Sequence, residues 1–584
     1  MSTRGWAIFL SLAGAVAAPA SAGEAPPKSV AVQRDARIPR ILSDSEREAF
    51  RAVFRSIRAG SWPDAQARLD ALPDALLTPF ARAELYTAKG SPKVELPQLQ
   101  ALLAIAPDLP QADQIGRIAK LRGAAEPPVL PVTQRLVWND GAPTRGRASP
   151  TRGDAAADAL ALKMVPFIKD DRAADAEALL ASSEATLSPA ARTEWRARVA
   201  WIYYLTGDDR NARRMAATAA DDGSEWASGA TWTDGLAAWR AGDCVGAVRA
   251  FDQVGRRAAD VELRAAGHYW SARADMRCAR PEGIQAKLRA AAQFDETFYG
   301  QLARETLGIA ADLSGAPPVE WAALEKNRNV RVAAALAEIG EARLAEEVLR
   351  HQARIGDRDS HAALIQLAGR LNLPSAQLWL THNTPQGINP PMASRYPTPD
   401  WTPDDGWRVD KSLLFAHALQ ESRFRTDVVS PAGAYGLMQI MPAAATDFSR
   451  KTGLAADRDA LTRPAFNMAV GQSHLEALRD RAGTGGLLPK VIAAYNAGPA
   501  PVDAWNATAR DKGDPLLYIE SIPYWETRGY VTIVLRNYWM YQQKAGEQPA
   551  SRSALAQGMW PRFPGLSGKT AVRLDTASGL ASAD

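Results

Sequence analysis

Helical periodicity runs through the first half of this 584-residue sequence, from about Asp44 to Ile309, with few strand-like alternations. Apolar residues recur there at the spacing of one helix face, as in the i, i+4, i+7 series Phe50, Phe54 and Ile57. The chain is too long for one compact hydrophobic core, so several domains or a solenoid are required. The pattern therefore predicts an all-α protein built from more than one packed unit.

Two consecutive segments of this region have the same plan, which indicates stacked helical hairpins. Residues 195–220 and 232–254 each comprise a helix, a Gly-Asp turn and a second helix rich in Ala and Arg. Hairpins of the tetratricopeptide type stack in this way, although the repeat here is not strict. We expect an N-terminal superhelical solenoid of helical hairpins, followed by a separate helical domain.

Changes in composition divide the chain into five parts. Pro, Gly, Arg, Ala and Asp dominate residues 123–158, which indicates an extended or partly disordered connection inside the solenoid. Dense proline later in the chain indicates a linker, and the small polar residues at the end indicate a loose tail. The expected boundaries are 1–22 for a signal peptide, 44–382 for the solenoid, 383–404 for the Pro-rich linker, 405–545 for the C-terminal domain and 546–584 for a flexible tail. We expect the C-terminal domain to fold without the solenoid.

Residues 1–22 have the plan of a secretory signal peptide. Arg4 supplies the positive start, a short apolar segment follows, and Ala20-Ser21-Ala22 fits the small-x-small cleavage pattern. The apolar segment is too short to span a bilayer well, and no Cys follows the cleavage site to carry a lipid. We expect an exported, soluble mature protein without an integral membrane segment.

Charge and cysteine content narrow the possible partners. The formal net charge is +4 with a pI of about 8.9, and no long Lys/Arg run is present, so no nucleic-acid partner is expected.

Two cysteines, Cys244 and Cys278, are 34 residues apart, which is one hairpin repeat. In an exported protein an even number favours a disulfide slightly, and two buried thiols on neighbouring helices are the alternative.

One carboxyl group, that of Glu421, is placed to act as a general acid. A helix is expected through residues 410–423, with Asp410 as its N-cap. Leu414, Ala418 and Glu421 are at i, i+4 and i+7, so they share one face, and that face belongs in a core. Desolvation there raises the pKa of a carboxyl group, which is how a general acid is obtained near neutral pH.

The loop after this helix is suited to wrapping around a ligand. Ser430-Pro431 ends the preceding segment, and Gly433 and Gly436 allow tight turns or a close approach of the backbone. Gln439 is the only polar residue in the apolar run from Leu437 to Met441. Such an amide is either a satisfied core group or a ligand contact.

Two later segments complete the candidate site. Tyr495 and Asn496 lie at the end of a helix from about Pro489, because Gly498 and Pro499 stop it there. Further on, the segment 520–531 reads ESIPYWETRGYV and contains Glu520, Glu526, Arg528 and Tyr530. Glu526 and Arg528 are interpreted as a structural ion pair. His417 and His474 have no Cys or His at ligand spacing, so neither a metal nor another cofactor is expected.

These motifs resemble those of the soluble lytic murein transglycosylases, whose catalytic domain is similar to goose-type lysozyme. The family pattern begins with Glu-Ser, here Glu421-Ser422, and continues through Ser-Pro-x-Gly-Ala-x-Gly-Leu-Met-Gln-x-Met-Pro, matched from Ser430 to Pro442. Ala444 is a departure, because the family often has Thr there. The family also has Ala-Tyr-Asn-Ala-Gly and Glu-x-Ile-Pro-x-x-Glu-Thr-Arg-x-Tyr-Val at the later positions, and a helical superstructure before the catalytic domain, which residues 298–308 resemble most.

The resemblance implies a lysozyme-like helical catalytic domain that cleaves peptidoglycan glycan strands in the periplasm. It implies that Glu421 is the single acid/base, which forms a 1,6-anhydromuramic acid end without consuming water. The residues it assigns to substrate binding are Ser430, Gly436, Gln439, Met441, Tyr495, Asn496, Glu520 and Tyr530. Two alternatives stay open: a goose-lysozyme-like hydrolase with water as the acceptor, and a non-catalytic scaffold of the cell wall.

Overall fold

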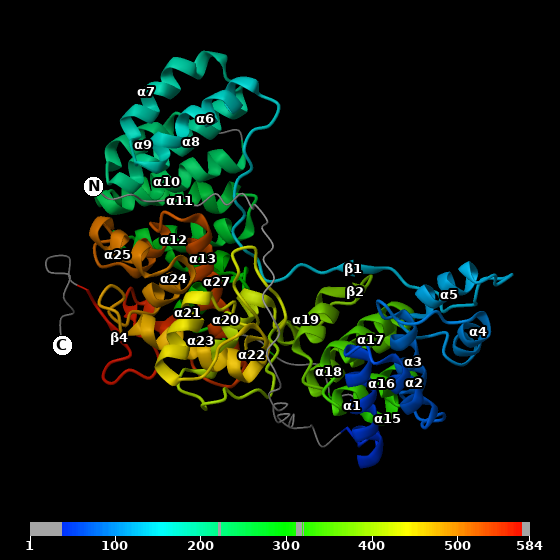
Figure 1. Cartoon of the computed structure of the whole chain (residues 1–584). Helices are drawn as coiled ribbons and strands as arrows, with labels where there is room; N and C mark the ends of the chain where they lie inside the picture. Colours follow the sequence, from blue (N-terminus) through cyan, green and yellow to red (C-terminus); the bar gives the residue numbers. More distant parts are fainter. Residues whose placement is uncertain (1–37, 220–222, 311–312, 314–317, 319, 575–584) are drawn as a thin grey trace.

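The computed structural model describes residues 38–219, 223–310, 313, 318 and 320–574, so the expected signal peptide lies outside the described residues. The fold is all-α, as predicted (Figure 1). Strands in the described ranges are limited to two short antiparallel pairs, β1 (Leu136–Trp138) with β2 (Asn383–Pro385) and β3 (Trp560–Pro561) with β4 (Ala571–Val572). Among the described residues, no helix has both the length and the apolar character needed to cross a bilayer.

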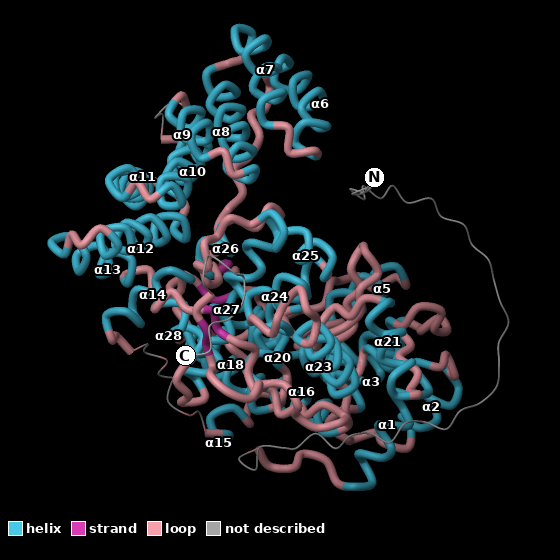
Figure 2. Tube along the Cα trace, turned by 90° about the vertical axis from the view of Figure 1, so that its left-hand side faces the viewer, coloured by secondary structure: helices cyan, strands magenta, loops and turns pink. Residues whose placement is uncertain are grey.

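The predicted solenoid is divided between two hydrophobic cores rather than continuous from 44 to 382. The first core combines helices from both ends of that range. Its members are α1 (Asp44–Arg58), α2 (Trp62–Asp70), α3 (Thr78–Thr87), α4 (Leu96–Ile105), α5 (Ala112–Leu121), α15 (Trp321–Leu324), α16 (Arg328–Glu338), α17 (Ala342–Ile355), α18 (His361–Arg370) and α19 (Pro374–His382). The chain therefore leaves this unit after α5 and returns to it at α15 (Figures 1 and 2).

The second core begins with the expected stack of helical hairpins. It consists of α6 (Ala155–Lys169), α7 (Ala173–Ser183), α8 (Pro189–Thr206), α9 (Asp209–Ala217), α10 (Glu225–Ala241), α11 (Cys244–Arg257), α12 (Val261–Arg277), α13 (Ile284–Ala292) and α14 (Phe298–Leu307). The predicted Gly-Asp turns end α8 and α10: Gly207 and Gly242 have φ values of 83° and 80°, which glycine adopts without strain. Cys244 and Cys278 are disulfide-bonded across α11 and α12, which confirms the favoured pairing.

The C-terminal domain is packed on this stack and belongs to the same core. Its helices are α20 (Lys411–Ser422), α21 (Pro442–Thr452), α22 (Arg458–Leu461), α23 (Pro464–Arg479), α24 (Leu488–Ala497), α25 (Pro499–Thr508), α26 (Pro515–Glu520), α27 (Trp525–Lys544) and α28 (Ala550–Ala556). The ring of Phe298 in α14 stacks on Trp539 in α27 with centroids 5.1 Å apart. This shared core argues against the expectation that the C-terminal domain folds alone.

Two segments that were expected to be loose are packed. The residues from 546 to 574 include α28 and the buried side chains Trp560 and Phe563, so the predicted flexible tail is wrong over this range. The Pro-rich segment 383–404 contains β2, the short 3-10 helix η4 (Met392–Arg395) and the fully buried Tyr396. Proline fixes φ and removes a backbone donor, but it does not prevent side chains between prolines from entering a core.

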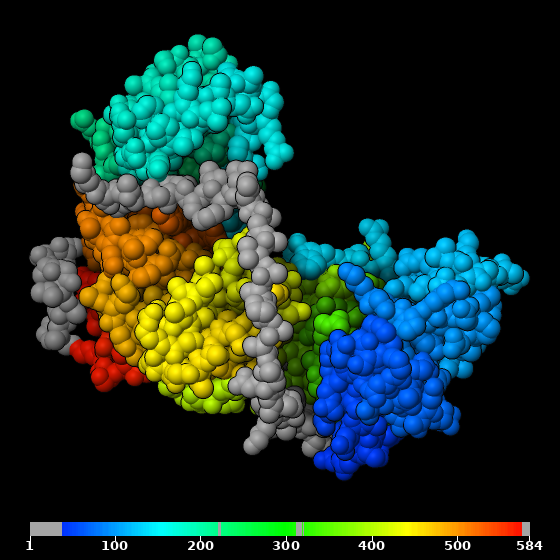
Figure 3. Space-filling view, viewed as in Figure 1, coloured from blue at the N-terminus to red at the C-terminus, as the bar shows by residue number. Residues whose placement is uncertain are grey.

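The irregular connection runs from residue 123 to 154, where α6 begins with Asp154 as its N-cap. It is extended, as predicted, but it is not loose, because β1 pairs with β2 and the segment then passes between the hairpin stack and the C-terminal domain (Figure 1). Figure 3 shows open space between the arm of α6 and α7 and the arm of α1–α5 in that view.

Candidate active site

Glu421 lies in the last turn of α20, where the predicted helix places it. Asp410 caps the start of α20 by accepting from the Ser412 N–H at 2.8 Å. Leu414 and Ala418 are fully buried, so the predicted apolar face is confirmed. The helix ends sharply because Arg423 and Phe424 both have positive φ, and the buried Phe424 ring holds this turn against the ring of Phe415.

The carboxyl group of Glu421 is mostly removed from water, and this sets its acidity. Burial raises the pKa of Glu421, a hydrogen bond from Tyr530 lowers it and the charge of Glu526 adds a smaller rise, which together bring this pKa to about 7. The Tyr530 hydroxyl is 2.5 Å from Oε1 of Glu421. A carboxyl group with this pKa is substantially protonated at neutral pH, as a general acid must be.

The loop 428–441 is compact and is joined to the helix of Glu421 through Tyr495, which bonds to the Met438 carbonyl and packs on His417. Tyr435 pairs with both Val429 and Ile440, and Ser430 closes a turn by accepting from the Ala434 N–H at 3.0 Å. Gly436 has positive φ, and a Cβ there would clash with the carbonyl oxygen of Leu461. Gly436 is therefore required for the shape of the loop. It is buried, so this role is structural and not a contact with a ligand.

Gln439 and Met441 differ in their contacts: the side chain of Gln439 is hydrogen-bonded within the loop, and that of Met441 is exposed. Gln439 has a φ of 48°, and its side-chain amide donates to the carbonyl oxygen of Gly436 at 2.8 Å. Of the two interpretations left open for Gln439, a satisfied group in the loop is the one that this bond supports. Met441 is 46% exposed at the start of α21, so its side chain is available to a ligand.

Asn467 in α23 is a supporting residue that sequence reasoning missed. It is fully buried; its Oδ1 accepts from the Met438 N–H at 2.9 Å and its Nδ2 donates to Leu461 O at 2.8 Å. The side chain thus replaces backbone partners that an irregular loop lacks. A single Asn in an otherwise ordinary helix carries no signal of this role.

Tyr495 and Asn496 are brought to the site by the end of α24, as expected. The Tyr495 hydroxyl donates to Met438 O at 2.8 Å, and its ring packs on His417 with centroids 4.6 Å apart. Asn496 accepts at Oδ1 from the hydroxyl of Thr527 at 2.6 Å, which joins α24 to the first turn of α27. Both residues fix the walls around Glu421.

Tyr530 has a closer role than the groove lining that was expected. Its side chain is buried, and its hydroxyl lies between Glu421 and Nδ1 of His417, 2.9 Å from the latter. Burial raises the pKa of Tyr530 well above its ordinary value, and the charge of Glu421 adds to this. Tyr530 is therefore a neutral hydrogen-bonding group that contacts the acid directly.

Glu520 was expected to bind substrate or to support the site, and its burial and pairing favour the supporting role. It is 1% exposed, and its carboxylate accepts two hydrogen bonds from Arg145, at 2.7 and 3.1 Å, and one from the hydroxyl of Tyr299 at 2.7 Å. Both partners come from outside the C-terminal domain. The carboxylate is buried and held by these three bonds, so it presents no solvent-facing side to a ligand.

Glu526 is the second carboxylate near the acid. It is exposed on the first turn of α27, and its charge raises the pKa of Glu421. The interpretation of Glu526 and Arg528 as an ion pair is wrong: among the described residues they form no ion pair with each other, and Arg528 donates to Ile522 O at 3.1 Å instead. In the part of the chain that the structure describes, no group of three or more His, Cys, Asp or Glu is arranged to hold a metal ion.

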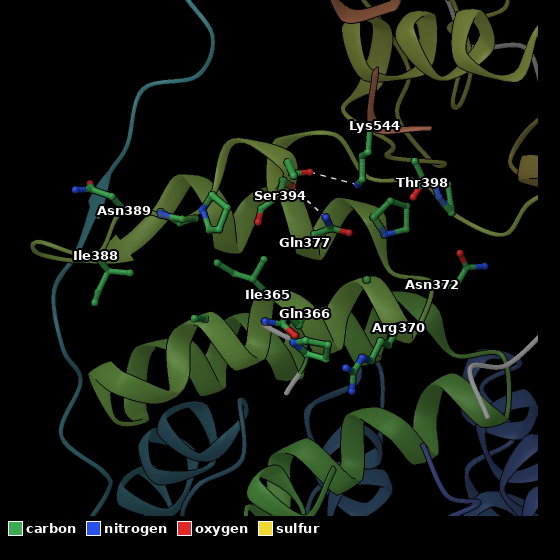
Figure 4. A pocket seen from close by; sticks show the side chains of 18 residues that line it. Ile365, Gln366, Arg370, Asn372, Gln377, Ile388, Asn389, Ser394, Thr398 and Lys544 are labelled. Atoms are coloured by element: carbon green, nitrogen blue, oxygen red, sulfur yellow. Dashed lines mark hydrogen bonds between the residues drawn. The ribbon is translucent and has the colours of Figure 1, made fainter. Parts of the chain in front are cut away.

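A cavity of about 470 Å³ lies away from these residues (Figure 4). It is bounded by α18, α19, the Pro-rich segment and the end of α27, and none of the candidate site residues lines it. Gln377 donates to Ser394 O at 3.0 Å and Lys544 to Tyr396 O at 2.6 Å, so these polar groups serve the packing of the segment. This cavity is therefore separate from Glu421 and the residues around it.

The fold and the site define a class: an all-α protein whose candidate site holds a desolvated carboxyl group, that of Glu421, suited to act as a general acid. Residues 403–517 match the family described as "Transglycosylase SLT domain". A region of 155 residues is 36% identical to the soluble lytic murein transglycosylase of Escherichia coli, covering 26% of this chain and 24% of that protein. The Salmonella typhimurium protein of the same name is 37% identical over 150 residues, 25% of this chain and 23% of that one. The matched region thus spans about a quarter of the length of these curated relatives.

Solved structures extend the likeness of fold beyond the matched domain. The 70 kDa soluble lytic transglycosylase from Escherichia coli covers 89% of this chain and 99% of its own length, with a TM-score of 0.51 and 16% identity. Its complex with bulgecin A gives a TM-score of 0.55 and 17% identity over the same shares. An inactive variant of lytic transglycosylase Slt from Pseudomonas aeruginosa gives 0.52 and 21%, covering 87% of this chain and 90% of that one. Residues 403–517 thus carry a transglycosylase SLT domain, and the fold of most of the chain is similar to that of these solved soluble lytic transglycosylases.

Proposed function

We propose that this protein is a lytic transglycosylase that cleaves the bond between N-acetylmuramic acid and N-acetylglucosamine in peptidoglycan. The observation that carries the proposal is the carboxyl group of Glu421, whose pKa burial raises to about 7 at the end of an apolar helix face. The family match over residues 403–517 supports the substrate class. Ser430, Met441 and Asn496 on the surrounding walls are the groups that we expect to meet the glycan.

The reaction requires one acid that later acts as a base. Glu421 gives its proton to the glycosidic oxygen, and the bond from that oxygen to the muramyl anomeric carbon breaks, its electron pair leaving with the oxygen. The acetamido group of the substrate supports the positive charge. The Glu421 carboxylate then takes the proton of the muramyl 6-hydroxyl as this oxygen bonds to the anomeric carbon, which regenerates the acid and gives an anhydro ring.

The tethered hydroxyl has an advantage over water that the site geometry reinforces. It belongs to the reacting ring, so its effective concentration is high once the ring is held in a reactive pucker. The apolar wall formed by Leu437, Met438 and Ile440 is buried and limits the access of water. Glu526 favours the hydrolytic alternative, since an exposed carboxylate near the acid could hold an attacking water.

Digestion of purified murein in oxygen-18 water separates these outcomes. We expect muropeptides that end in anhydromuramic acid, one water lighter than hydrolysed ends and without label. Labelled reducing ends as the main product would establish a hydrolase. A wild-type protein that binds murein and releases nothing would favour the non-catalytic scaffold.

Glu421→Gln is the matching variant, since it keeps the shape of the side chain and removes its proton. Cleavage should fall by orders of magnitude, while murein binding in a pull-down persists. Near-normal cleavage by this variant would remove Glu421 from the mechanism.

We also propose that residues 1–22 direct export to the periplasm, which cell fractionation with and without these residues would test.

A further inference from the structure

Two hydrogen bonds converge on the hydroxyl group of Tyr530, which carries a single proton. Its oxygen lies 2.5 Å from Oε1 of Glu421 and 2.9 Å from Nδ1 of His417. Tyr530 can donate only one of these bonds, so one of its neighbours must donate the other. His417 is fully buried in α20, one turn before Glu421.

The protonation state of Glu421 decides which neighbour donates. When Glu421 is ionised, Tyr530 donates to the carboxylate and Nδ1 of His417 must carry a proton. When Glu421 is protonated at Oε1, the acid donates to Tyr530, and Tyr530 donates to an unprotonated Nδ1. An imidazole whose Nδ1 is unprotonated therefore favours the acid form of Glu421.

The surroundings of His417 keep it neutral and leave this tautomer accessible. Nε2 is buried without a hydrogen-bond partner among the described residues, so no donor there fixes the proton on Nδ1, and the N–H at Nε2 in the proposed tautomer is left without an acceptor. Burial, with a smaller contribution from nearby His474, lowers the pKa of His417 to about 3. The imidazole thus acts as a hydrogen-bond partner and not as a charge.

The other titratable groups around this chain of bonds do not replace His417. Tyr495 in α24 packs on His417, but its hydroxyl is bonded to Met438 O. His474 in α23 contacts the ring of Tyr495, with centroids 5.4 Å apart. Glu526 in α27 acts on Glu421 through its charge. In the described part of the chain, only His417 shares the hydroxyl of Tyr530 with Glu421.

We propose that His417 is a positioning residue for the proton donor, which, through the hydroxyl of Tyr530, holds the proton on Glu421 until the substrate takes it. The inference deepens the proposed function and rests on it. His417 accepts from Tyr530, so the phenolic oxygen is oriented to accept from the protonated acid. The proton that leaves Glu421 for the glycosidic oxygen is returned by the 6-hydroxyl, and the proton of Tyr530 stays on Tyr530.

The pH dependence of cleavage by the full-length protein tests this role. In the wild type, activity should fall on the alkaline side as Glu421 loses its proton. His417→Leu should move this limb to lower pH by roughly half to one unit, the size expected for one lost hydrogen bond. His417→Asn places an amide near the position of Nδ1 and should restore the limb. His474→Leu, which also removes a buried imidazole beside Tyr495, should leave it unchanged.

A double-mutant cycle separates positioning from packing. In a Tyr530→Phe background, His417→Leu should cause no further shift of the limb, because the hydroxyl that links them is gone. An equal shift in both backgrounds, or no shift in the wild-type background, would overturn the proposal. The pKa of the Glu421 carboxyl, followed by carbon-13 NMR and assigned with Glu421→Gln, should show the same pattern. This readout needs no turnover, so it distinguishes failure of this inference from failure of the proposed function.

Discussion

At the scale of single residues, the acidity of Glu421 has a consequence for stability. Its pKa in the folded protein is raised from an ordinary value of 4.5 to about 7. The folded state therefore holds its proton more tightly than the unfolded state, and the free energy of unfolding falls as pH rises through this window. The stabilisation is complete below the unfolded pKa and is lost above the folded one.

Glu421→Gln should remove this pH dependence. The variant should unfold at a higher temperature than the wild type near pH 8, by the equivalent of about 1–3 kcal/mol, because the wild type then buries a charge. Near pH 4 the two proteins should be closely matched. Thermal unfolding at both pH values measures this difference, and a variant less stable than the wild type at the higher pH would contradict it.

Glu526 offers a second residue-scale prediction, because its negative charge raises the pKa of Glu421. Glu526→Gln should lower that pKa and move the alkaline limb of cleavage to lower pH by less than about one unit, since the exposed carboxylate is screened by water. The pH–rate profile on murein checks this. Loss of labelled ends in oxygen-18 water on the same substitution would instead show that Glu526 activates water.

The sequence located the buried carboxyl group of Glu421 but not the residues that contact it. Glu421 and the loop from Ser430 are close in sequence, and local motifs specify them. Tyr530 was assigned to the groove because no local pattern shows that its hydroxyl lies against a carboxyl group 109 residues away. The supporting role of Glu520 could not be told from substrate binding for the same reason: its partner Arg145 is 375 residues distant and lies in a segment without periodicity.

At the scale of elements, the extended segment between α5 and α6 connects the hairpin stack to the C-terminal domain by hydrogen bonds to both. Gly146 donates its N–H to Asp260 at the N-terminus of α12, at 2.8 Å, and Arg536 of α27 donates to Pro143 O. Arg145 lies between these contacts and reaches Glu520. A segment with the composition of a linker is thus fixed by its polar contacts on two sides, which sequence periodicity does not report.

Arg145→Met should destabilise the protein strongly, because Glu520 is then a buried carboxylate without its cation. Breaking one side of a buried pair costs about 3–5 kcal/mol. The double variant Arg145→Met with Glu520→Gln should recover much of this loss, since the neutral amide still accepts from the Tyr299 hydroxyl. Urea unfolding of the single and double variants gives the coupling energy, and simple additivity would show that the pair is not coupled.

At the scale of the whole molecule, the two hydrophobic cores explain why the helices were predictable and the domains were not. Amphipathic spacing gives each helix its buried face, and Gly207 and Gly242 give the hairpin turns. The spacing of apolar residues along a helix does not indicate which other helix its buried face packs against. The pairing of α1–α5 with α15–α19, and of α14 with α27 and α28, depends on contacts between distant parts of the chain.

The shared core predicts how the C-terminal domain behaves when it is expressed alone. A fragment of residues 403–574 would lose the partners of three buried or half-buried charged groups. Glu520 would lose Arg145, Asp514 would lose Arg273 at 2.9 Å, and Arg552 would lose Glu305 at 2.7 Å. The fragment would also expose the face of Trp539 that Phe298 covers. Each unpaired group costs free energy that a domain of this size cannot easily absorb.

We therefore expect this fragment to be prone to aggregation and to unfold with poor cooperativity at a lower temperature than the full chain. Co-expression with residues 134–310, which carry Arg145, Arg273, Phe298 and Glu305, should restore a soluble complex with a cooperative transition. A matched partner fragment with Arg145→Met should rescue less well, because it restores the apolar contact but leaves Glu520 unpaired. A fragment of 403–574 that melts cooperatively near the full-length temperature without its partner would show that the C-terminal domain is self-sufficient, and that the contacts with α12 and α14 only fix its position.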